Sequence, residues 1–333
     1  MPSSRPAILW DAISVTEVSV SQIDVSIIIV SYNTADLTAA AIKSVYDETR
    51  ASSFEVIVVD NASSDGSADL IAKQYPQVRL TRLKTNVGFA AANNLAAAEA
   101  NGRYVLLLNP DTVVLNGAID TLVAFADEHP LYGVYGGSTF YPDGSRNPTA
   151  GWNKATVWSL FCAATGLMSV FRGSPLFDPE SLASWDWQSA REVGIVTGCF
   201  MLLDRAFWNE LGGFDERFHM YAEDADISLR SAAAGRPAVI CPAAAIVHYG
   251  GASEPVYADR MVRLLTAKVQ LFRKHWRGPA AWYAVTMLKT WVFTRALYTR
   301  VKDAPRGVAQ TDSWPAVWRR RKEWIGARDV QTC

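Results

Sequence analysis

Apolar, strand-like runs alternate with helical patterns along the first third of the chain, and this alternation restricts the fold more than any other feature. Four such runs, each followed by a segment with helical spacing, are VSIIIV (25–30), EVIVVD (55–60), QVRLTRL (77–83) and YVLLLN (104–109). Short continuous apolar runs are typical of strands buried on both faces, and strand–helix alternation favours right-handed βαβ units. We therefore predict an α/β domain with a mostly parallel sheet flanked by helices.

The rest of the chain has a different pattern. Residues 133–195 are rich in Gly, Pro and Trp, which predicts loops or a small mixed insertion, and residues 195–205 predict another strand. An extended segment leads to His248, and two long amphipathic helical stretches follow residue 256. The predicted parts are an N-terminal extension (1–24), an α/β domain (25–255) and a basic, Trp-rich helical extension (256–333).

The net charge of −1 hides a strong asymmetry. Residues 256–333 contain 16 Lys and Arg against 5 Asp and Glu, whereas residues 1–255 contain 16 against 28. Half of the 12 tryptophans also lie in the basic tail. Basic, aromatic, amphipathic helices are typical of binding to an anionic membrane surface, with packing on the α/β domain or on a second subunit as an equal alternative. The tail contains no recognised nucleic-acid-binding module, so no nucleic-acid partner is expected.

The cysteine pattern and the lengths of the apolar runs indicate the expected cellular compartment. The four cysteines are scattered without a CxxC pair, which favours a reducing, cytoplasmic environment. No signal-peptide pattern and no run of about 18 apolar residues is present. Lys289 and Arg295 interrupt the most apolar stretch of the tail. The expected protein is cytoplasmic, with peripheral attachment to the inner face of the cell membrane if the tail binds lipid.

Polar side chains follow three predicted strands, in Ser31–Asn33, Asp60–Asn61 and Asn109–Asp111. Each alone could be an ordinary polar loop, but ligands of open α/β sheets bind at the carboxyl ends of the strands, so three together indicate a ligand site. The first turn reads SYNTADL and not GxGxxG, and no GxxxxGK[ST] loop occurs, so dinucleotide and P-loop sites are disfavoured.

An acidic rim favours a divalent cation as a bridge to phosphate. Hard oxygen ligands suit Mg²⁺ or Mn²⁺, and Asp111 can supply one oxygen. His248 can supply a nitrogen ligand, or it can be an ordinary polar loop residue.

The stretch MYAEDADISLR (220–230) gathers Glu223, Asp224 and Asp226 at the start of a helical pattern. One or two acids would cap the helix and complement its dipole. A third indicates a partner for the excess charge, such as a substrate proton or a cation. Asp226 is interpreted as a cap or as an ion-pair anchor for Arg230, four residues later.

Taken in order, these motifs resemble the family-2 glycosyltransferases of the GT-A fold, in their rhamnosyltransferase-like branch. The resembling stretches are VSIIIVSYNTADLTAAAIKSV, VIVVDNASSDGSADLI, NVGFAAANNLA, YVLLLNPDTVV, VTGCFMLLDRAFWNELGGFDERFHMYAEDADISLRSAAAG and IVHYGGAS. The resemblance divides the α/β domain into a nucleotide-sugar half (about 25–115) and an acceptor half (about 116–255).

The resemblance implies an inverting transfer of a sugar from a nucleotide-sugar donor, with Asp60 contacting the nucleobase or ribose. NPD stands at the family's DXD motif, so Asn109 replaces the first acid and metal binding depends mainly on Asp111, with His248 adding a ligand to the metal or the diphosphate. The implied donor-binding residues are Ser31, Tyr32, Asn33, Asp60, Asn61, Asn86, Gly88, Asn93, Asn109 and Asp111.

The family's ED pair falls on Glu223 and Asp224. The resemblance assigns the general base to Asp224, with Glu223 orienting the acceptor or substituting as base. The preferred donor is dTDP-L-rhamnose, and the acceptor is a glycan or lipid-linked hydroxyl in cell-surface polysaccharide synthesis. The alternatives are a UDP-hexose-dependent transferase of the same fold and a non-catalytic nucleotide- or glycan-binding scaffold.

Overall fold

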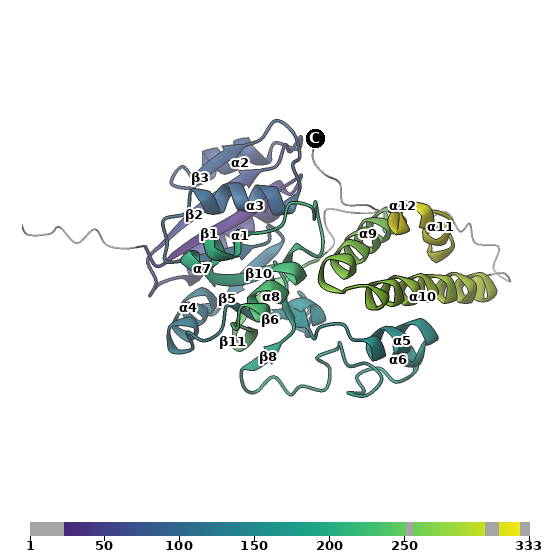
Figure 1. The fold of residues 1–333 in the computed structure, drawn as a ribbon. Helices are drawn as coiled ribbons and strands as arrows, with labels where there is room; N and C mark the ends of the chain where they lie inside the picture. Colours follow the sequence, from purple (N-terminus) through teal and green to yellow (C-terminus); the bar gives the residue numbers. More distant parts are fainter. Residues whose placement is uncertain (1–22, 251–255, 304–312, 327–333) are drawn as a thin grey trace, which may run out of the picture.

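The computed structural model describes residues 23–250, 256–303 and 313–326 (Figure 1). The predicted N-terminal extension (1–24) lies outside this part of the chain except for its last two residues, and so do the predicted boundary near residue 255 and two segments of the helical extension. Figure 1 shows an α/β body and, beside it, a group of helices contributed mainly by the end of the chain.

The four predicted strands of the first third are present and pair in parallel. The elements are β1 (Val25–Ser31), α1 (Ala35–Glu48), β2 (Phe54–Asp60), α2 (Ser67–Gln74), β3 (Arg79–Arg82), α3 (Phe89–Ala98) and β4 (Tyr104–Leu108). Alternate residues of β1 enter different cores, Ile27 on one face of the sheet and Ile28 on the other. The helices on both faces explain why every residue of β1 is buried.

The second half completes the same sheet. Its elements are β5 (Thr112–Leu115), α4 (Ala118–Glu128), β6 (Val134–Phe140), β8 (Arg191–Val193), β10 (Phe200–Asp204), α7 (Arg205–Leu211), α8 (Glu223–Ala233) and β11 (Ala238–His248). Strand β9 (Ile195–Val196) belongs to a separate two-stranded sheet with β7 (Gly151–Trp152). The strand order is β3-β2-β1-β4-β10-β6-β11-β5, with β8 beside β11. Strand β10 runs antiparallel to β4 and β6, and β5 and β8 run antiparallel to β11. The predicted α/β fold with a flanked sheet is confirmed.

The prediction of loops or a small insertion over residues 133–195 is wrong for its first part, because β6 is an inner strand of the main sheet. Its sequence, VYGGSTF, gives a weak strand signal because of two central glycines. A Cβ at Gly136 would lie 2.5 Å from the Val196 side chain, and one at Gly137 would lie 2.2 Å from the backbone oxygen of Ala244. The glycines are therefore required by close packing.

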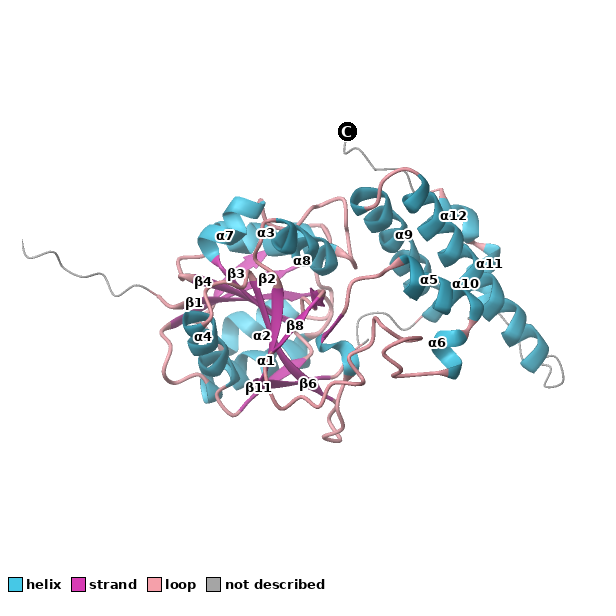
Figure 2. Ribbon diagram, turned by 60° about the horizontal axis from the view of Figure 1, so that its bottom comes forward, coloured by secondary structure: helices cyan, strands magenta, loops and turns pink. Residues whose placement is uncertain are grey.

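The remaining helices form what we call the helical module, made of α5 (Val157–Thr165), α6 (Leu167–Val170), α9 (Tyr257–His275), α10 (Pro279–Asp303), α11 (Trp314–Arg319) and α12 (Arg321–Ile325). Figures 1 and 2 both place α5 beside α10, far along the chain. A separate core joins Leu160 of α5 to Leu265, Leu288 and Trp324. The short elements η1 (Pro148–Ala150) and β7 (Gly151–Trp152) precede α5.

Most apolar side chains of the tail pack inside the helical module. Of the six tryptophans beyond residue 256, Trp324 is buried and only Trp282 is strongly exposed, at 71%. The apolar faces of α9 and α10 therefore pack mainly against protein. Within the three described segments, no helix combines the length and the hydropathy that crossing a bilayer requires.

Candidate active site

Two of the predicted polar strand ends lie side by side. The parallel register of β1 and β2 pairs Ser31 with Asp60, so the loops after these strands meet at one rim of the sheet. Ser63 donates to Asp60 Oδ2 through its backbone N–H at 3.2 Å, while no described group hydrogen-bonds to the buried Oδ1 of Asp60. A buried carboxylate oxygen without a donor is costly unless a ligand supplies one.

The loop before α3 is held by amide side chains. Asn61 donates to Asn86 Oδ1 at 3.1 Å and accepts from the backbone N–H of Val87 at 2.9 Å. Gly88 has φ +90°, and a Cβ there would lie 2.4 Å from His219 Nδ1. Gly88 therefore lets the loop that carries His219 pack directly against the rim.

The side chains of the predicted donor-binding residues differ in their exposure to solvent. Tyr32 and Asn33 are exposed at the rim, and Ser64 donates to Asn33 Oδ1 at 2.8 Å. Ser31 is buried with its hydroxyl bonded to Thr34 and Thr38, and Asn93 is buried with its side chain bonded to the backbone oxygen of Phe89. Ser31 and Asn93 therefore shape the site from inside the protein.

The predicted metal-binding residues lie together because β5 and β11 pair antiparallel, with Thr112 opposite His248. His248 Nε2 lies 3.4 Å from Asp111 Oδ1, and Asp111 Oδ2 accepts from the backbone N–H of Gly250 at 3.0 Å. The buried Oδ1 of Asn109 has no hydrogen-bond partner among the described residues. A carboxylate, an imidazole and a free amide oxygen fit a divalent cation that takes its other ligands from phosphate and water.

The charge state of His248 depends on Asp111. Burial alone would lower the pKa of His248, but hydrogen bonds to Asp111 and Cys199 outweigh it and raise the pKa to about 10. Thr149 lies 3.2 Å from Nδ1 of the same ring.

Across the described residues no group of three or more His, Cys, Asp and Glu could hold a metal by itself. Protein ligands alone would therefore leave such an ion incompletely coordinated.

The acidic pair stands at the first turn of α8. Asp224 accepts from the backbone N–H of Gly198 at 3.2 Å and from that of Ala225 at 2.7 Å. Glu223 is 6% exposed, and its Oε2 has no hydrogen-bond partner among the described residues. Tyr221 and Ala222, which lead into the helix, have φ of 70° and 67°, a strained backbone often found at functional sites.

The two carboxyl groups have different proton affinities. Burial, and next the charge of Asp224, raise the pKa of Glu223 well above its ordinary value. Burial also raises the pKa of Asp224, but the backbone N–H groups of Gly198 and Ala225 stabilise its charged form. Asp224 therefore ionises first, and Glu223 keeps its proton beside it.

Gly198 and Cys199 connect the acidic pair to the loop before α3 and to the Asn109–Asp111 turn. The backbone N–H of Asn109 donates to the Cys199 oxygen at 3.0 Å. A Cβ at Gly198 would lie 3.3 Å from the Phe89 ring and 3.8 Å from Asp224 Cβ. The loop before α3, the Asn109–Asp111 turn and Asp224 therefore converge on the segment formed by Gly198 and Cys199.

Asp226 is bonded inside the protein. Its ion pair with Arg230, at 2.7 Å, confirms the anchor interpretation, and its side chain is fully buried. Lys274 and His275 of α9 also contact Asp226 Oδ1, at 2.6 and 2.7 Å. Burial would raise the pKa of Asp226, but hydrogen bonds from His275 and Lys274 together with Arg230 lower it. The third acid thus joins α8 to the helical module.

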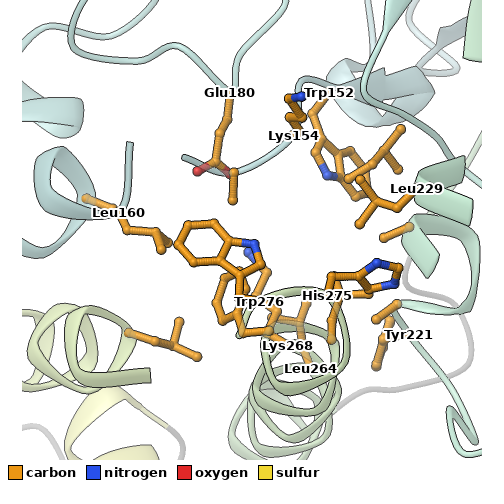
Figure 3. Close-up of a pocket in the computed structure, with 18 of the residues that line it drawn as sticks. Trp152, Lys154, Leu160, Glu180, Tyr221, Leu229, Leu264, Lys268, His275 and Trp276 are labelled. Atoms are coloured by element: carbon orange, nitrogen blue, oxygen red, sulfur yellow. The ribbon is translucent and has the colours of Figure 1, made fainter. Parts of the chain in front are cut away.

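A cavity of about 420 Å³ lies between α8 and the helical module (Figure 3). Glu223 and Asp224 line it, together with side chains of α5, α9 and α10. In Figure 3, Trp276 projects into the space, and Lys154 and Glu180 lie across from it. The acidic pair therefore faces a space large enough for part of a substrate.

Several of these residues were not predicted from the sequence. Gly198 and His219 make backbone contacts that no short motif marks. Lys268 and Trp276 belong to an amphipathic pattern that predicted α9 but gave no sign that α9 lines the cavity. The one available signal was the excess acid at Asp226, for which the sequence indicated Arg230 as a partner but not Lys274 or His275.

The chain is similar to known glycosyltransferases in sequence and in fold. The family model described as "Glycosyl transferase family 2" matches residues 26–208, more than half of the chain. N-acetylglucosaminyl-diphospho-decaprenol L-rhamnosyltransferase of Mycobacterium tuberculosis is 29% identical over 247 residues, which cover 68% of this chain and 78% of that protein. O-antigen biosynthesis protein RfbC of Myxococcus xanthus is 30% identical over 69% of this chain, but the match covers only 17% of that protein.

Solved structures share the fold. Mannosyltransferase PcManGT from Pyrobaculum calidifontis, in complex with GDP-Man and Mn²⁺, matches with a TM-score of 0.54 at 18% identity, covering 92% of this chain and 86% of that chain. TarS 1-349 from S. aureus, in complex with UDP-GlcNAc, matches with a TM-score of 0.50 at 16% identity, covering 92% and 79%. At these identities the likeness supports the GT-A fold alone.

Proposed function

The chain belongs to glycosyl transferase family 2, and from this premise we propose that it is an inverting, metal-dependent rhamnosyltransferase. Its donor is dTDP-L-rhamnose, and its acceptor is a hydroxyl group of a glycan or lipid-linked sugar in cell-surface polysaccharide synthesis. The relative that acts as an L-rhamnosyltransferase on a decaprenol-linked sugar supports both assignments.

One observation carries the proposal. Asp224 stands where the Gly198 segment brings the carboxyl ends of the sheet against a substrate-sized cavity. A carboxylate that is ionised beside a protonated neighbour is suited to accept a proton, because one charge is stabilised and the second is not formed. This arrangement favours Asp224 over Glu223 as the general base.

The reaction then follows as a single displacement. The acceptor hydroxyl oxygen attacks the anomeric carbon from the side opposite the diphosphate, and Asp224 takes the hydroxyl proton. The bond from the anomeric carbon to the diphosphate oxygen breaks with its electron pair, so the nucleoside diphosphate leaves and the configuration inverts. While it remains protonated, Glu223 donates a hydrogen bond to the acceptor and orients it.

The chain's own residues supply the donor end. Asp60, with its unpaired Oδ1, accepts a hydrogen bond from the nucleoside, and Asn61, Asn86 and Gly88 hold the loop over it. Asp111 and His248, with Asn109, would hold Mg²⁺ or Mn²⁺ beside the diphosphate. A bound cation supplies charge neutralisation for the leaving diphosphate.

The donor assignment is tested by the full chain without acceptor. With Mn²⁺, dTDP-L-rhamnose is expected to raise Tm by roughly 5 °C near saturation and to release dTDP by slow hydrolysis, because only a matching donor gains full binding energy. UDP-glucose, UDP-GlcNAc and GDP-mannose serve as controls. A larger response to a UDP-sugar would favour the UDP-hexose alternative, and binding with no hydrolysis or transfer from any donor would favour a non-catalytic scaffold.

We also propose a division of labour along the chain. Residues 25–115 bind the nucleotide sugar, residues 116–255 carry the base and the acceptor site, and residues 256–333 close that site and meet the membrane. The packing of α5 with α10 supports this division, since Thr294 bonds to Ala164 and Arg295 to Ser169.

Membrane contact is proposed for one face of the module. Exposed apolar side chains on α10 and around α5 and α6 are Trp158, Val170, Phe171, Phe293, Leu297, Tyr298 and Val301. Arg300 and Lys302 lie exposed among them. An apolar surface with adjacent cations suits an anionic bilayer, on which α10 lies without crossing.

R300Q/K302Q is expected to weaken co-sedimentation with phosphatidylglycerol-containing phosphatidylcholine vesicles by roughly fivefold for each charge removed. K43Q/K73Q, on the distant helices α1 and α2, is the matched control and keeps wild-type binding. High salt weakens wild-type binding because the attraction is screened. Equal binding of both double variants, or equal binding to neutral vesicles, would contradict membrane attachment through this face.

A further inference from the structure

We propose that the cavity between α8 and the helical module binds the apolar chain of an amphipathic acceptor, in which the acceptor sugar is joined to that chain through a diphosphate. This inference rests on the proposed function, because it identifies the acceptor class of that same site. It assigns a substrate-binding role to α5, which lies within the residues matched by the family model, and to α9 and α10, which lie outside them.

The position of the cavity relates it to the reacting group. Glu223 and Asp224 line it, so a molecule that fills it lies against the proposed base. Phe89, which follows the loop before α3, and the Asn109–Asp111 turn contact the same Gly198–Cys199 segment that lies beside Asp224. An acceptor with its hydroxyl at Asp224 therefore has the rest of its length directed into the cavity.

The cavity walls are mostly apolar. Side chains from three helices of the module face it, among them Leu160, Leu264, Phe272, Trp276, Met287 and Trp291. Leu264, Trp276, Met287 and Trp291 are only partly buried although they belong to well-packed helices. A purely carbohydrate ligand would leave its hydroxyl groups unpaired against such walls, whereas an apolar chain removes both surfaces from water.

The polar groups in the cavity suit an anion next to that chain. Lys154 and Lys268 are the cationic lysines of the lining, and Figure 3 shows them on different walls of the cavity. His275 also lines it but is bonded to Asp226. Lysine ammonium groups bind phosphate oxygens as point charges. A diphosphate between the sugar and the apolar chain would lie where these lysines can reach it.

The α9 wall is fixed in place. Lys274 contacts Asp215 and Asp226 at 2.7 and 2.6 Å, and His275 contacts Asp226 at 2.7 Å. These bonds hold the end of α9 against α8, next to Trp276. The cavity is therefore a formed site, and binding does not have to pay for assembling its walls.

The volume limits how much chain can enter. About 420 Å³ corresponds to roughly 14 water-sized groups, since each occupies about 30 Å³. The acceptor sugar and diphosphate need part of that space near Asp224. Fewer than about 14 such groups are therefore left for the chain, which is at most about two five-carbon units, so the effect of chain length must saturate early.

The first test compares acceptors with one sugar diphosphate and apolar chains of increasing length, used as monomers with the full chain and saturating donor. Each buried methylene is expected to raise kcat/KM by up to about fourfold, until a plateau at or below about 10 carbons. Transfer that does not depend on chain length would overturn the subsite. If no acceptor is glycosylated and no donor is hydrolysed, the proposed function itself fails.

A cavity-filling variant locates the effect. Ala163 of α5 lines the cavity, so A163W should reduce transfer to long-chain acceptors far more than transfer to the shortest acceptor, and so abolish most of the gain from chain length. Thr165, exposed on the same helix, provides the control T165W, which keeps the gain. An equal loss with short and long acceptors in A163W would overturn the placement of the chain in this cavity.

A second variant tests the diphosphate. K268Q is expected to raise KM for the diphosphate-linked acceptor by about tenfold, with little change for a neutral glycoside carrying the same chain, because only the former loses a charge-assisted contact. K289Q, exposed on α10 outside the cavity lining, is the matched control. An equal change for both acceptors would overturn the anion assignment. Wild-type KM values in K268Q would do the same.

Discussion

Asp224→Asn is expected to slow sugar transfer by about 10²–10⁴-fold while donor affinity stays close to that of the unchanged protein. Asparagine keeps the shape of the side chain and can accept one of the two backbone hydrogen bonds, which reach different oxygens of Asp224 from Gly198 and Ala225, but it cannot take the acceptor proton. Donor binding is retained because Asp60 and Asp111 are unchanged. Single-turnover transfer and calorimetric donor binding, measured on the same preparation, separate the two effects.

Glu223→Gln is the matched variant. Gln resembles the protonated glutamic acid that the buried site favours, so this variant should keep most of the activity. In the unchanged protein, the acid limb of kcat/KM should lie above the ordinary pKa of aspartate, because the pKa of Asp224 is raised and activity is lost when it is protonated below that value. The base would be Glu223 if Glu223→Gln were inactive and Asp224→Asn were active.

Asp111→Ala should weaken metal-dependent donor binding by more than about a hundredfold, because even outer partners of metal ligands contribute 10–100-fold. The loss also removes the carboxylate that lies 3.4 Å from His248, the other proposed ligand. Calorimetry with dTDP-L-rhamnose, in Mn²⁺ and in chelator, measures the effect.

Two further variants make the result for Asp111 specific. Asp111→Asn removes the charge but keeps the size of the side chain, so it should share most of the loss if coordination is the cause. Asp69→Ala removes an exposed acid of α2 that pairs with Arg82, and it should leave donor binding unchanged. Metal-independent donor affinity in the unchanged protein, or normal affinity in Asp111→Ala, would refute the proposed coordination.

Strands β1, β2 and β4 could be predicted because they are mainly apolar runs buried on both faces, whereas the edge strand β3 (RLTR) gave a weaker signal. Strand β6 could not, since Gly136 and Gly137 are placed by contacts with Val196 and Ala244 that lie far away in the chain. Its pairing partner β11 also has a register shift between Cys241 and Ala245. Local propensity has no access to such contacts.

In the candidate site, too, some features could be predicted from the sequence and others could not. Asp60, Asp111 and Asp224 could be predicted because they stand at strand or helix ends within recognisable motifs. The cavity could not, because its walls come from helices separated by about a hundred residues, α5 and α9 to α10. The amphipathic pattern of α9 predicted an apolar face but not what that face would contact.

The contacts of Asp226 also have a consequence for the order of synthesis. Arg230, four residues away, emerges from the ribosome almost together with Asp226, but Lys274 and His275 follow only after some fifty more residues. Chains grow at about 5–20 residues per second, and N-terminal units fold first. The nascent α/β body therefore exists for several seconds with this carboxylate incompletely neutralised and one wall of the acceptor cavity missing. Translation itself thus delays completion of the acceptor site until α9 has been made.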